Sequence, residues 1–229
     1  MIGLLQHRRG LSLFLAVSLC ISLLALPCMG TAAATGKFDK RNTYASGQFI
    51  DVGDSAWYAG NVRTVYELGL MKGKSAGRFD PDGNVTIAEP VTIAARMHAI
   101  YYGSKEAFPT SDPWYETYYS HAGEQGILPS LNAEANTPAP RLQVSLLLQK
   151  TLPASELPAI NRVADDAIVD VRSGEYGADA VYEFYRAGIM TGSNKAGTFH
   201  PAANVKRSEV AAVVSRLVDA SQRKHVCQQ

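Results

Sequence analysis

The sequence predicts an all-α fold, mainly helical with short loops, in which three helix–loop–helix repeats form a pseudo-threefold helical prism. The first observation is a phrase written twice: the stretch from Asp51 to Glu89 recurs between Asp170 and Glu209, with spacings that agree to within one residue. The second observation is that apolar residues follow helical spacing in each copy. Because helices this short are not stable alone, we expect them to bury their apolar faces against one another.

The first repeat, residues 49–103, has start and stop signals for two helices. Its first helix should begin near Trp57 and end at Gly69, a residue typical of a C-terminal cap. The second helix should begin at Thr86, because Thr86 and Glu89 have the spacing of a capping box. The buried stripe of this second helix is expected at Ile93, Ala94, Met97 and Tyr101.

The third repeat, residues 168–220, follows the same plan. Gly188 should end its first helix. Lys206 stands where the first repeat has Thr86, so the cap of the second helix is expected to be weaker. The apolar face of that helix is regular and comprises Val210, Val213, Val214, Leu217 and Val218.

The second repeat, residues 104–153, is degenerate. Trp114 aligns with Trp57 of the first repeat, but residues 129–140 lack the Gly-x-Phe-x-Pro turn of the other two copies. The repeat is therefore recognisable mainly from its position. Its buried stripe is expected at Val144, Leu147 and Leu148.

Residues 1–34 have the features of a secretory signal peptide. Two arginines form a charged start, residues 11–26 are apolar, and residues 31–34 are small, as a cleavage site requires. A retained membrane anchor is the main alternative, but the apolar run is shorter than the ~20 residues that a spanning helix needs. A twin-arginine signal and a lipoprotein cysteine at Cys28 are further alternatives. We expect a secreted chain with no membrane partner after signal cleavage.

Three other segments are expected to flank or connect the repeats. Residues 35–48 are polar and rich in Gly, Ser and Thr, which predicts a disordered leader. Residues 154–167 are predicted to be a linker, and residues 221–229 a tail. Once the signal is removed, Cys227 is the remaining cysteine, so no internal disulfide is expected.

Charge and motif content argue against several functions. The formal net charge is +1 and no basic stripe appears, so nucleic acid is not an expected partner. The histidines lack metal-ligand spacing, and neither a metal nor another cofactor is expected. Residues 73–77 fit the Gly-x-Ser-x-Gly pattern of hydrolases, but that motif needs a preceding strand, and a helix is predicted there instead. We therefore expect a protein that is not an enzyme.

The repeated phrase resembles the S-layer homology family, whose domains usually occur in threes. The Phe-x-Asp-Val start of the family pattern matches residues 49–52. Its loop and turn motifs match residues 69–73, 77–81, 188–192 and 197–201. The resemblance implies a helical prism at the bacterial cell wall or S-layer surface. It also implies non-covalent binding to secondary cell-wall polysaccharide, typically bearing pyruvylated N-acetylmannosamine.

The best-known binding feature of the family is a Thr-Arg-Ala-Glu motif, whose arginine lines a groove between repeats. The three copies here have Ile87, Arg141 and Arg207 at the arginine position. Only the third copy keeps both the arginine and the glutamate of the motif. A guanidinium in the first turn of a helix suits a carboxylate, because the helix N-terminus adds free amides and partial positive charge. We expect at most two competent anion sites, with Arg207 the stronger. Glu89 and Glu209 are expected to be helix caps.

Other residues complete the expected groove. Each aromatic near the start of a first helix could stack on a sugar face or be an apolar anchor of that helix, and each aspartate could accept a sugar hydroxyl or cap a helix. A structural or S-layer-associated protein that binds another surface protein is the main alternative function, followed by a wall-acting hydrolase. The expected polysaccharide-binding residues are Arg207, Arg141, Asp170, Asp51, Trp57, Trp114, Tyr176 and Lys206.

Overall fold

The structure is a computed structural model that describes residues 37–104, 108–129, 134–194 and 196–226. All structural statements below concern these residues. The predicted signal peptide, residues 1–34, lies outside them, as do the first two residues of the expected leader and Cys227.

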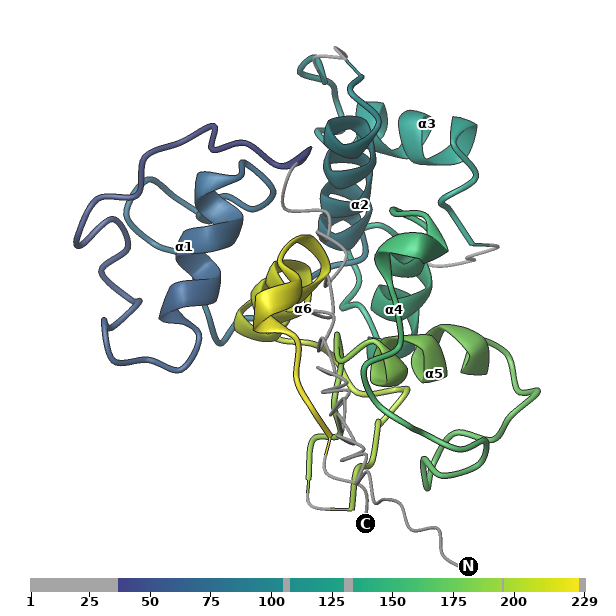
Figure 1. The fold of residues 1–229 in the computed structure, drawn as a ribbon. Coiled ribbons are helices and arrows are strands. Elements are labelled where there is room, and N and C mark those ends of the chain that lie inside the picture. Colours follow the sequence, from purple (N-terminus) through teal and green to yellow (C-terminus); the bar gives the residue numbers. More distant parts are fainter. Residues whose placement is uncertain (1–36, 105–107, 130–133, 195, 227–229) are drawn as a thin grey trace, which may run out of the picture. The chain divides into compact units, whose positions relative to one another are not determined.

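The described residues are helical and form no sheet, so the all-α prediction is confirmed for this part of the chain (Figure 1). Strand-like backbone pairing among the described residues is limited to isolated β-bridges. The prism arrangement and the repeat boundaries stay predictions. The helices are α1 (Ala59–Glu67), α2 (Ala88–Tyr101), α3 (Glu116–Glu124), α4 (Arg141–Gln149), α5 (Ala178–Arg186) and α6 (Arg207–Val218), with short 3-10 helices η2 (Ala154–Glu156) and η3 (Ala220–Gln222).

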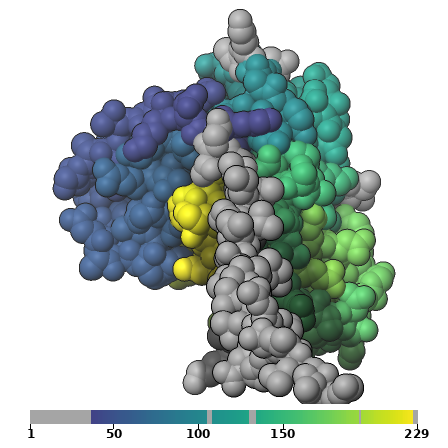
Figure 2. Space-filling model, viewed as in Figure 1, coloured from purple at the N-terminus to yellow at the C-terminus, as the bar shows by residue number. Residues whose placement is uncertain are grey.

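The helices form consecutive pairs, and each second helix packs against the first helix of another pair. Helix α2 contacts α3, α4 contacts α5, and α6 returns to α1 at the start of the chain. Figure 2 shows α6 beside the N-terminal pair, so segments far apart in sequence form one surface. Each pair therefore buries its apolar face against a neighbour, as expected for units too small to fold alone.

The three pairs are tied together by a closed cycle of backbone hydrogen bonds just before the second helices. The amide of Val85 donates to the carbonyl of Val205 (2.9 Å), Val205 to Ala139 (3.3 Å), and Ala139 back to Val85 (2.9 Å). All three residues are fully buried. Because buried amides need partners, this cycle ties together the three loops that enter α2, α4 and α6.

The predicted apolar stripes lie in one buried cluster. On α6 the stripe fills the core through Val210 and Val214, which are fully buried, and α2 contributes Met97 in the same way. Leu147 and Leu148 of α4 are also fully buried, so the degenerate second pair keeps its core face. The apolar spacing of the sequence therefore identified the inward faces correctly.

Residues 37–48 of the expected leader are packed and not disordered as predicted, and the expected linker, residues 154–167, is packed as well. Asn42 donates through Nδ2 to the carbonyl of Tyr66 (2.7 Å), and Asn161 makes the equivalent bond to Tyr185 (2.9 Å). Phe38 and Leu157, at corresponding places before these asparagines, are buried. Each segment is mostly polar but contains one buried apolar residue and one asparagine. These two residues hold the segment against the end of α1 or α5.

Asn161→Ala is expected to lower the free energy of unfolding by about 2 kcal/mol, as measured by urea denaturation. The asparagine bonds the carbonyls of Tyr185 and Lys224 and accepts the amide of Val226, so its loss leaves buried groups unpaired. Asn42→Ala removes one bond and serves as the matched control, with an expected loss of about 1 kcal/mol. Equal stability of Asn161→Ala and the parent would show that residues 154–167 are not packed as described.

Candidate functional site

Arg207, the strongest expected binding residue, lies in the interior between two helix pairs. It is the first residue of α6 and is 4% exposed. Its Nε donates to the carbonyl of Phe79 (2.8 Å) and its Nη2 to that of Lys72 (2.7 Å), while Nη1 pairs with Glu89. The guanidinium also lies over the Phe79 ring at 4.7 Å. Burial lowers the pKa of this guanidinium, and Glu89 partly opposes that effect.

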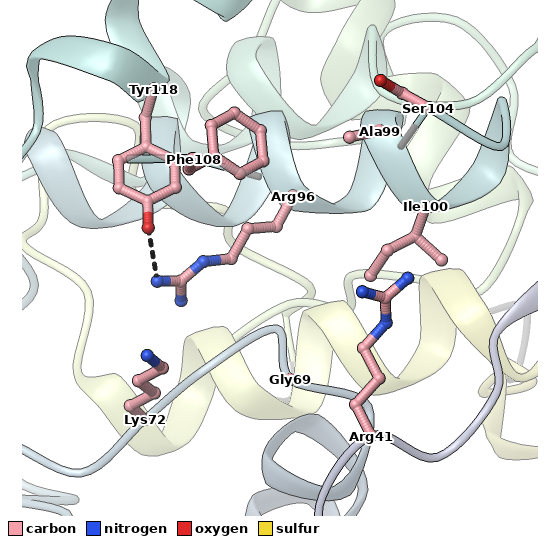
Figure 3. Close-up of a pocket in the computed structure, with 9 residues that line it drawn as sticks. All are labelled: Arg41, Gly69, Lys72, Arg96, Ala99, Ile100, Ser104, Phe108 and Tyr118. Atoms are coloured by element: carbon pink, nitrogen blue, oxygen red, sulfur yellow. Dashed lines mark hydrogen bonds between the residues drawn. The ribbon is translucent and has the colours of Figure 1, made fainter. Parts of the chain in front are cut away.

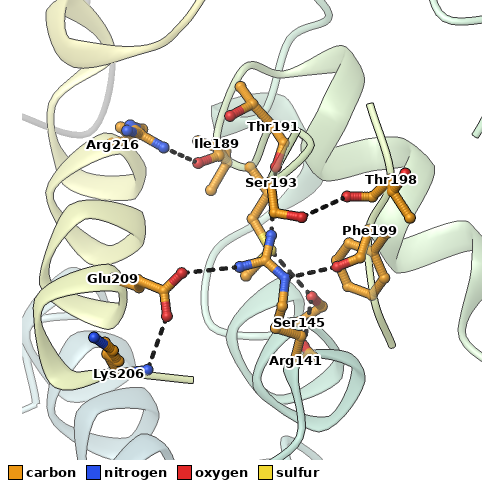
Figure 4. Close-up of polar contacts among 11 residues, drawn as sticks. Arg141, Ser145, Ile189, Thr191, Ser193, Thr198, Phe199, Lys206, Glu209 and Arg216 are labelled. Carbon is orange, nitrogen blue, oxygen red and sulfur yellow. Dashed lines mark hydrogen bonds and ion pairs between the residues drawn. The ribbon is translucent and has the colours of Figure 1, made fainter. Parts of the chain in front are cut away.

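Arg141 repeats this arrangement at the next junction (Figure 4). It begins α4, is 8% exposed, and donates through Nε to the carbonyl of Phe199 (2.9 Å) and through Nη2 to that of Thr191 (3.3 Å). Its Nη1 lies 3.8 Å from a carboxylate oxygen of Glu209. Each arginine thus reaches into a loop of the neighbouring pair that its own helix contacts. The backbone carbonyls of that loop accept hydrogen bonds from its guanidinium.

The third junction, where α2 contacts α3, has neither the arginine nor the glutamate. Ile87 stands in place of the arginine and is 2% exposed, while Gln143 replaces the glutamate. The backbone link remains, since the Ile87 amide donates to the carbonyl of Thr137 (2.9 Å), as Arg207 does to Gly83 (2.9 Å). A buried arginine without a loop or carboxylate to receive it would cost several kcal/mol, so an apolar residue suits this place.

The two glutamates have a double role. One carboxylate oxygen of Glu89 accepts the amide of Thr86 (2.9 Å), and one of Glu209 accepts that of Lys206 (2.9 Å), so the expected caps are confirmed for the glutamate side. The other oxygen of each meets an arginine from a neighbouring pair. The motif's arginine and glutamate therefore join one pair to the next.

Asp51 and Asp170 hold the Phe-x-Pro turns. Asp51 accepts the amides of Phe79 and Asp80 (both 2.9 Å), and Asp170 accepts those of Phe199 (2.8 Å) and His200 (2.6 Å). Burial pushes the pKa of Asp51 upward, but the two amides outweigh it and hold the pKa below its ordinary value. Both carboxylates are engaged within the chain and cap neither α1 nor α5.

The three aromatic candidates lie at the surface. Trp57 is 64% exposed, Trp114 49% and Tyr176 65%, each just before the first helix of its pair. They are available to stack on a ligand and contribute little to the core. Lys206 is also at the surface, where its ammonium lies 2.8 Å from Asp82. The structure thus buries Arg207 and Arg141 at junctions between pairs and leaves the three aromatics and Lys206 at the surface.

A groove between α2 and α3, with a volume of about 240 Å³, brings together basic residues that the sequence did not single out (Figure 3). We call it the α2·α3 groove. Arg41 comes from the N-terminal segment, Lys72 from the loop after α1, and Arg96 from α2. The remaining lining residues are Gly69, Ala99, Ile100, Ser104, Phe108 and Tyr118.

Arg96 is held in place, while the other two cations are not engaged. Arg96 donates to the carbonyl of Leu70 (3.3 Å) and the hydroxyl of Tyr118 (2.8 Å). Phe108 stacks on Tyr118 with ring centroids 4.6 Å apart and so supports this wall. The charged ends of Arg41 and Lys72 have no partner among the described residues, and both residues are exposed. Their charges are available to a ligand.

A second groove of about 490 Å³ lies between α6 and α1, and we call it the α6·α1 groove. Arg216 takes the place of Arg96, since its Nη1 donates to the carbonyl of Ile189 (3.0 Å) as Arg96 does to Leu70. Burial, followed by repulsion from Arg141, lowers the pKa of Arg216. The remaining lining residues are Trp57, Gly60, Asn61, Thr64, Gln222 and Lys224.

Between α4 and α5, apolar side chains of α4 pack against the residue that precedes α5. Gly177 precedes α5, and a Cβ built on it would lie 2.7 Å from Leu142 and 3.3 Å from Leu146. Its φ of +79° also favours glycine. Large residues on α4 thus pack closely against a glycine at this junction.

The sequence did contain a signal for two of the missed residues. Arg96 and Arg216 occupy matching positions of the two clear copies, on helices that are otherwise largely apolar. A charged residue repeated within such a stripe indicates a role at the edge of the buried face. Arg41 and Lys72 had no such signal, because one lies in a polar segment and the other has a threonine, Thr191, as its counterpart.

These features define a class: a helical repeat protein whose units are joined by arginines and separated by solvent-facing grooves. The S-layer homology domain model matches residues 48–89 and 154–211. These two segments are thus similar to S-layer homology domains. The second matched segment begins within the expected linker, in agreement with the packing of Asn161. S-layer homology domains support an anchoring role at the cell wall or S-layer and a location at the cell surface.

Two curated relatives are similar to this chain. An endoglucanase from Bacillus sp. (strain KSM-635) is 28% identical over 222 residues, which cover 93% of this chain and 22% of the relative. A cell surface protein from Thermoanaerobacter kivui is 28% identical over 115 residues, which cover 50% of this chain and 14% of the relative. The chain thus spans a quarter or less of the length of either relative.

The described residues lack two further features. No group of three or more His, Cys, Asp or Glu side chains there could hold a metal ion. No helix in the same part of the chain is long and apolar enough to cross a membrane.

Arg207→Ala is expected to lower the free energy of unfolding by about 3 kcal/mol, measured by urea denaturation. The change removes bonds to the carbonyls of Phe79 and Lys72 and leaves Glu89 without its arginine. Arg141→Ala should cost less, since Glu209 is more exposed and more distant.

The matched control is Arg78→Ala, an exposed arginine of the same loop, which should change stability by less than about 0.5 kcal/mol. Similar losses for Arg207→Ala and Arg78→Ala would contradict the junction role of Arg207.

Proposed function

We propose that this chain is a non-catalytic anchoring module that binds acidic secondary cell-wall polysaccharide, with the α2·α3 groove as its main site. The observation that carries the proposal is the convergence of Arg41, Lys72 and Arg96 on one groove. Two of these cations have no partner among the described residues. Three positive charges gathered from separate segments repel one another, so their proximity favours an anionic ligand.

A pyruvylated sugar suits this groove. Its ketal carries one carboxylate, which Arg41 can bind through paired N–H groups and Lys72 can approach as a compact charge. The groove, about 240 Å³, is smaller than the roughly 300–1,000 Å³ of drug-sized pockets, so we expect it to hold one sugar residue of a longer chain. The Phe108–Tyr118 wall offers an apolar edge for the ring.

The α6·α1 groove is expected to bind the same polymer more weakly. It presents the exposed face of Trp57 and the amides of Asn61 and Gln222, which already bond each other at 3.1 Å. Its basic groups are Arg216 and Lys224, fewer than in the α2·α3 groove. Two linked weak sites raise the effective concentration of polymer, so they can retain the protein on the wall together.

Arg207 acts on binding indirectly, through the backbone of Lys72. It bonds the carbonyl of Lys72, and so fixes the loop that presents the Lys72 ammonium to the groove. We therefore assign Arg207 a positioning role. The exposed aromatics Trp57, Trp114 and Tyr176 stay candidates for stacking on further sugar residues.

Lys72→Ala and Arg41→Ala are each expected to weaken binding to purified cell-wall polysaccharide about tenfold at low salt, because each removes one charge-assisted contact. Neither change touches a bond that holds the fold, since Arg207 uses the backbone carbonyl of Lys72. Lys40→Ala is the matched control: it removes the same charge beside Arg41 but outside the groove, where Lys40 pairs with Glu67. Equal binding by all three variants would contradict the assigned groove.

The polymer itself is tested with wall sacculi in three states: intact, freed of pyruvyl groups, and stripped of secondary polysaccharide. The proposal requires that the protein is retained strongly by intact sacculi, more weakly by sacculi without pyruvyl groups, and not at all by sacculi without secondary polysaccharide. Retention that survives stripping would instead support a structural protein that binds another surface protein. Release of soluble sugar from intact sacculi would support a wall-acting hydrolase.

A further inference from the structure

Residues 223–226, which follow η3, lie in an extended conformation beside the end of α5. The Lys224 amide donates to the carbonyl of Gly188 (2.9 Å). Asn161 bonds the same segment through both ends of its side-chain amide: Nδ2 donates to the Lys224 carbonyl (2.9 Å) and Oδ1 accepts the Val226 amide (3.0 Å). A strand that is added to a sheet edge is bound in the same way, through backbone groups of alternate residues. We call Asn161 and Gly188 the α5 receptor.

The same arrangement is built at the end of α1, from Asn42 and Gly69, and we call it the α1 receptor. The amides of Arg41 and Asn42 share the carbonyl of Glu67 (2.7 and 3.0 Å), and the same pair of bonds recurs at the end of α5. Gly69 has a φ of +72°, close to the +70° of Gly188. The two receptors therefore present their asparagine and glycine on equivalent backbones.

The α1 receptor differs in that no segment of the described chain crosses it. A Cβ built on Gly188 would lie 2.5 Å from the Lys224 carbonyl oxygen, because the tail passes directly over this glycine. At Gly69 the nearest atom is instead in the Arg41 side chain, at 3.3 Å, and Figure 3 shows both residues beside the α2·α3 groove. Within the described part of the chain, no donor bonds the Gly69 carbonyl or the Asn42 Oδ1. These groups can therefore bond an added backbone.

Charge distinguishes the two receptors and indicates what the α1 receptor would bind. Ile160 borders the α5 receptor, whereas Arg41 stands at the matching position of the α1 receptor. Lys72 adds a second charge on the same groove. The chain's own tail carries Arg223 and Lys224, so like charges disfavour the tail of a second copy at this place. An extended segment with acidic side chains is complementary to it.

We propose that the α1 receptor binds an extended acidic segment of a partner protein through hydrogen bonds to its backbone, as the α5 receptor binds the chain's own tail. This goes beyond the proposed function, because it concerns a protein partner and depends on Asn42, which has no part in the polymer site. Both ligands use Arg41, so the acidic segment and the polymer are expected to exclude each other.

The test uses three blocked peptides: residues 221–226, the same peptide carrying Arg223→Glu and Lys224→Glu, and this acidic peptide with Val226→Pro added. Binding at low salt is followed by the NMR signals of the Asn42 side-chain amide. The acidic peptide should bind at least about tenfold more tightly than the basic one, since it brings carboxylates to the groove cations. Proline lacks the amide that Asn42 Oδ1 would accept, so the third peptide should bind about tenfold more weakly than the second. Equal binding of the acidic and proline peptides would overturn recognition through the backbone.

Variants of the protein complete the test, with Thr43→Ala, a change at the exposed next residue, as the matched control. Asn42→Ala should bind the acidic peptide about tenfold more weakly, yet bind wall polymer within about twofold of the parent. Arg41→Glu keeps its backbone bond to Glu67, and should reverse the preference in favour of the basic peptide even if Asn42→Ala folds poorly.

Two results would overturn the proposal: acidic-peptide binding that Asn42→Ala leaves unchanged, or a preference of the parent for the basic peptide, which would instead favour the tail of a second copy. Absence of polymer binding by the parent would count against the proposed function alone, because the peptide measurements use no polymer.

Discussion

The fold depends on how one helix pair fastens to another. Backbone amides close a cycle through Val85, Val205 and Ala139, and two arginines extend the contact into neighbouring loops. These groups are buried, so they must be paired, and the available partners lie in another pair. No pair can therefore complete its hydrogen bonds alone, and the units are expected to fold together.

The same constraint positions the surface that we assign to binding. Arg207 is anchored by the carbonyls of Phe79 and Lys72, which fixes a loop whose outer side carries the Lys72 ammonium. The position of Lys72 in the α2·α3 groove thus depends on the buried contacts of Arg207. Under the proposed function, Arg207, which is itself 4% exposed, acts on binding by fixing this loop.

Much of the fold followed from local patterns, because apolar spacing and capping glutamates act over a few residues. The buried faces of α2 and α6 and the cap at Glu89 were predicted in this way. The site could not be predicted equally well. A first-turn arginine has the same sequence signature whether it faces a ligand or, like Arg207, two carbonyls of a distant loop. The groove cations also come from separate segments, and Arg41 lies in one whose composition suggested disorder.

The central claim is that the ligand's carboxylate meets the groove cations and not the motif arginines. An NMR titration of the arginine Nε–H signals with a pyruvylated wall fragment tests this directly. The account predicts shifts for Arg41 and Arg96, with the Nε–H signals of Arg207 and Arg141 unchanged, since those protons are bonded to buried carbonyls. Large shifts at Arg207 and Arg141 with none at Arg96 would contradict it.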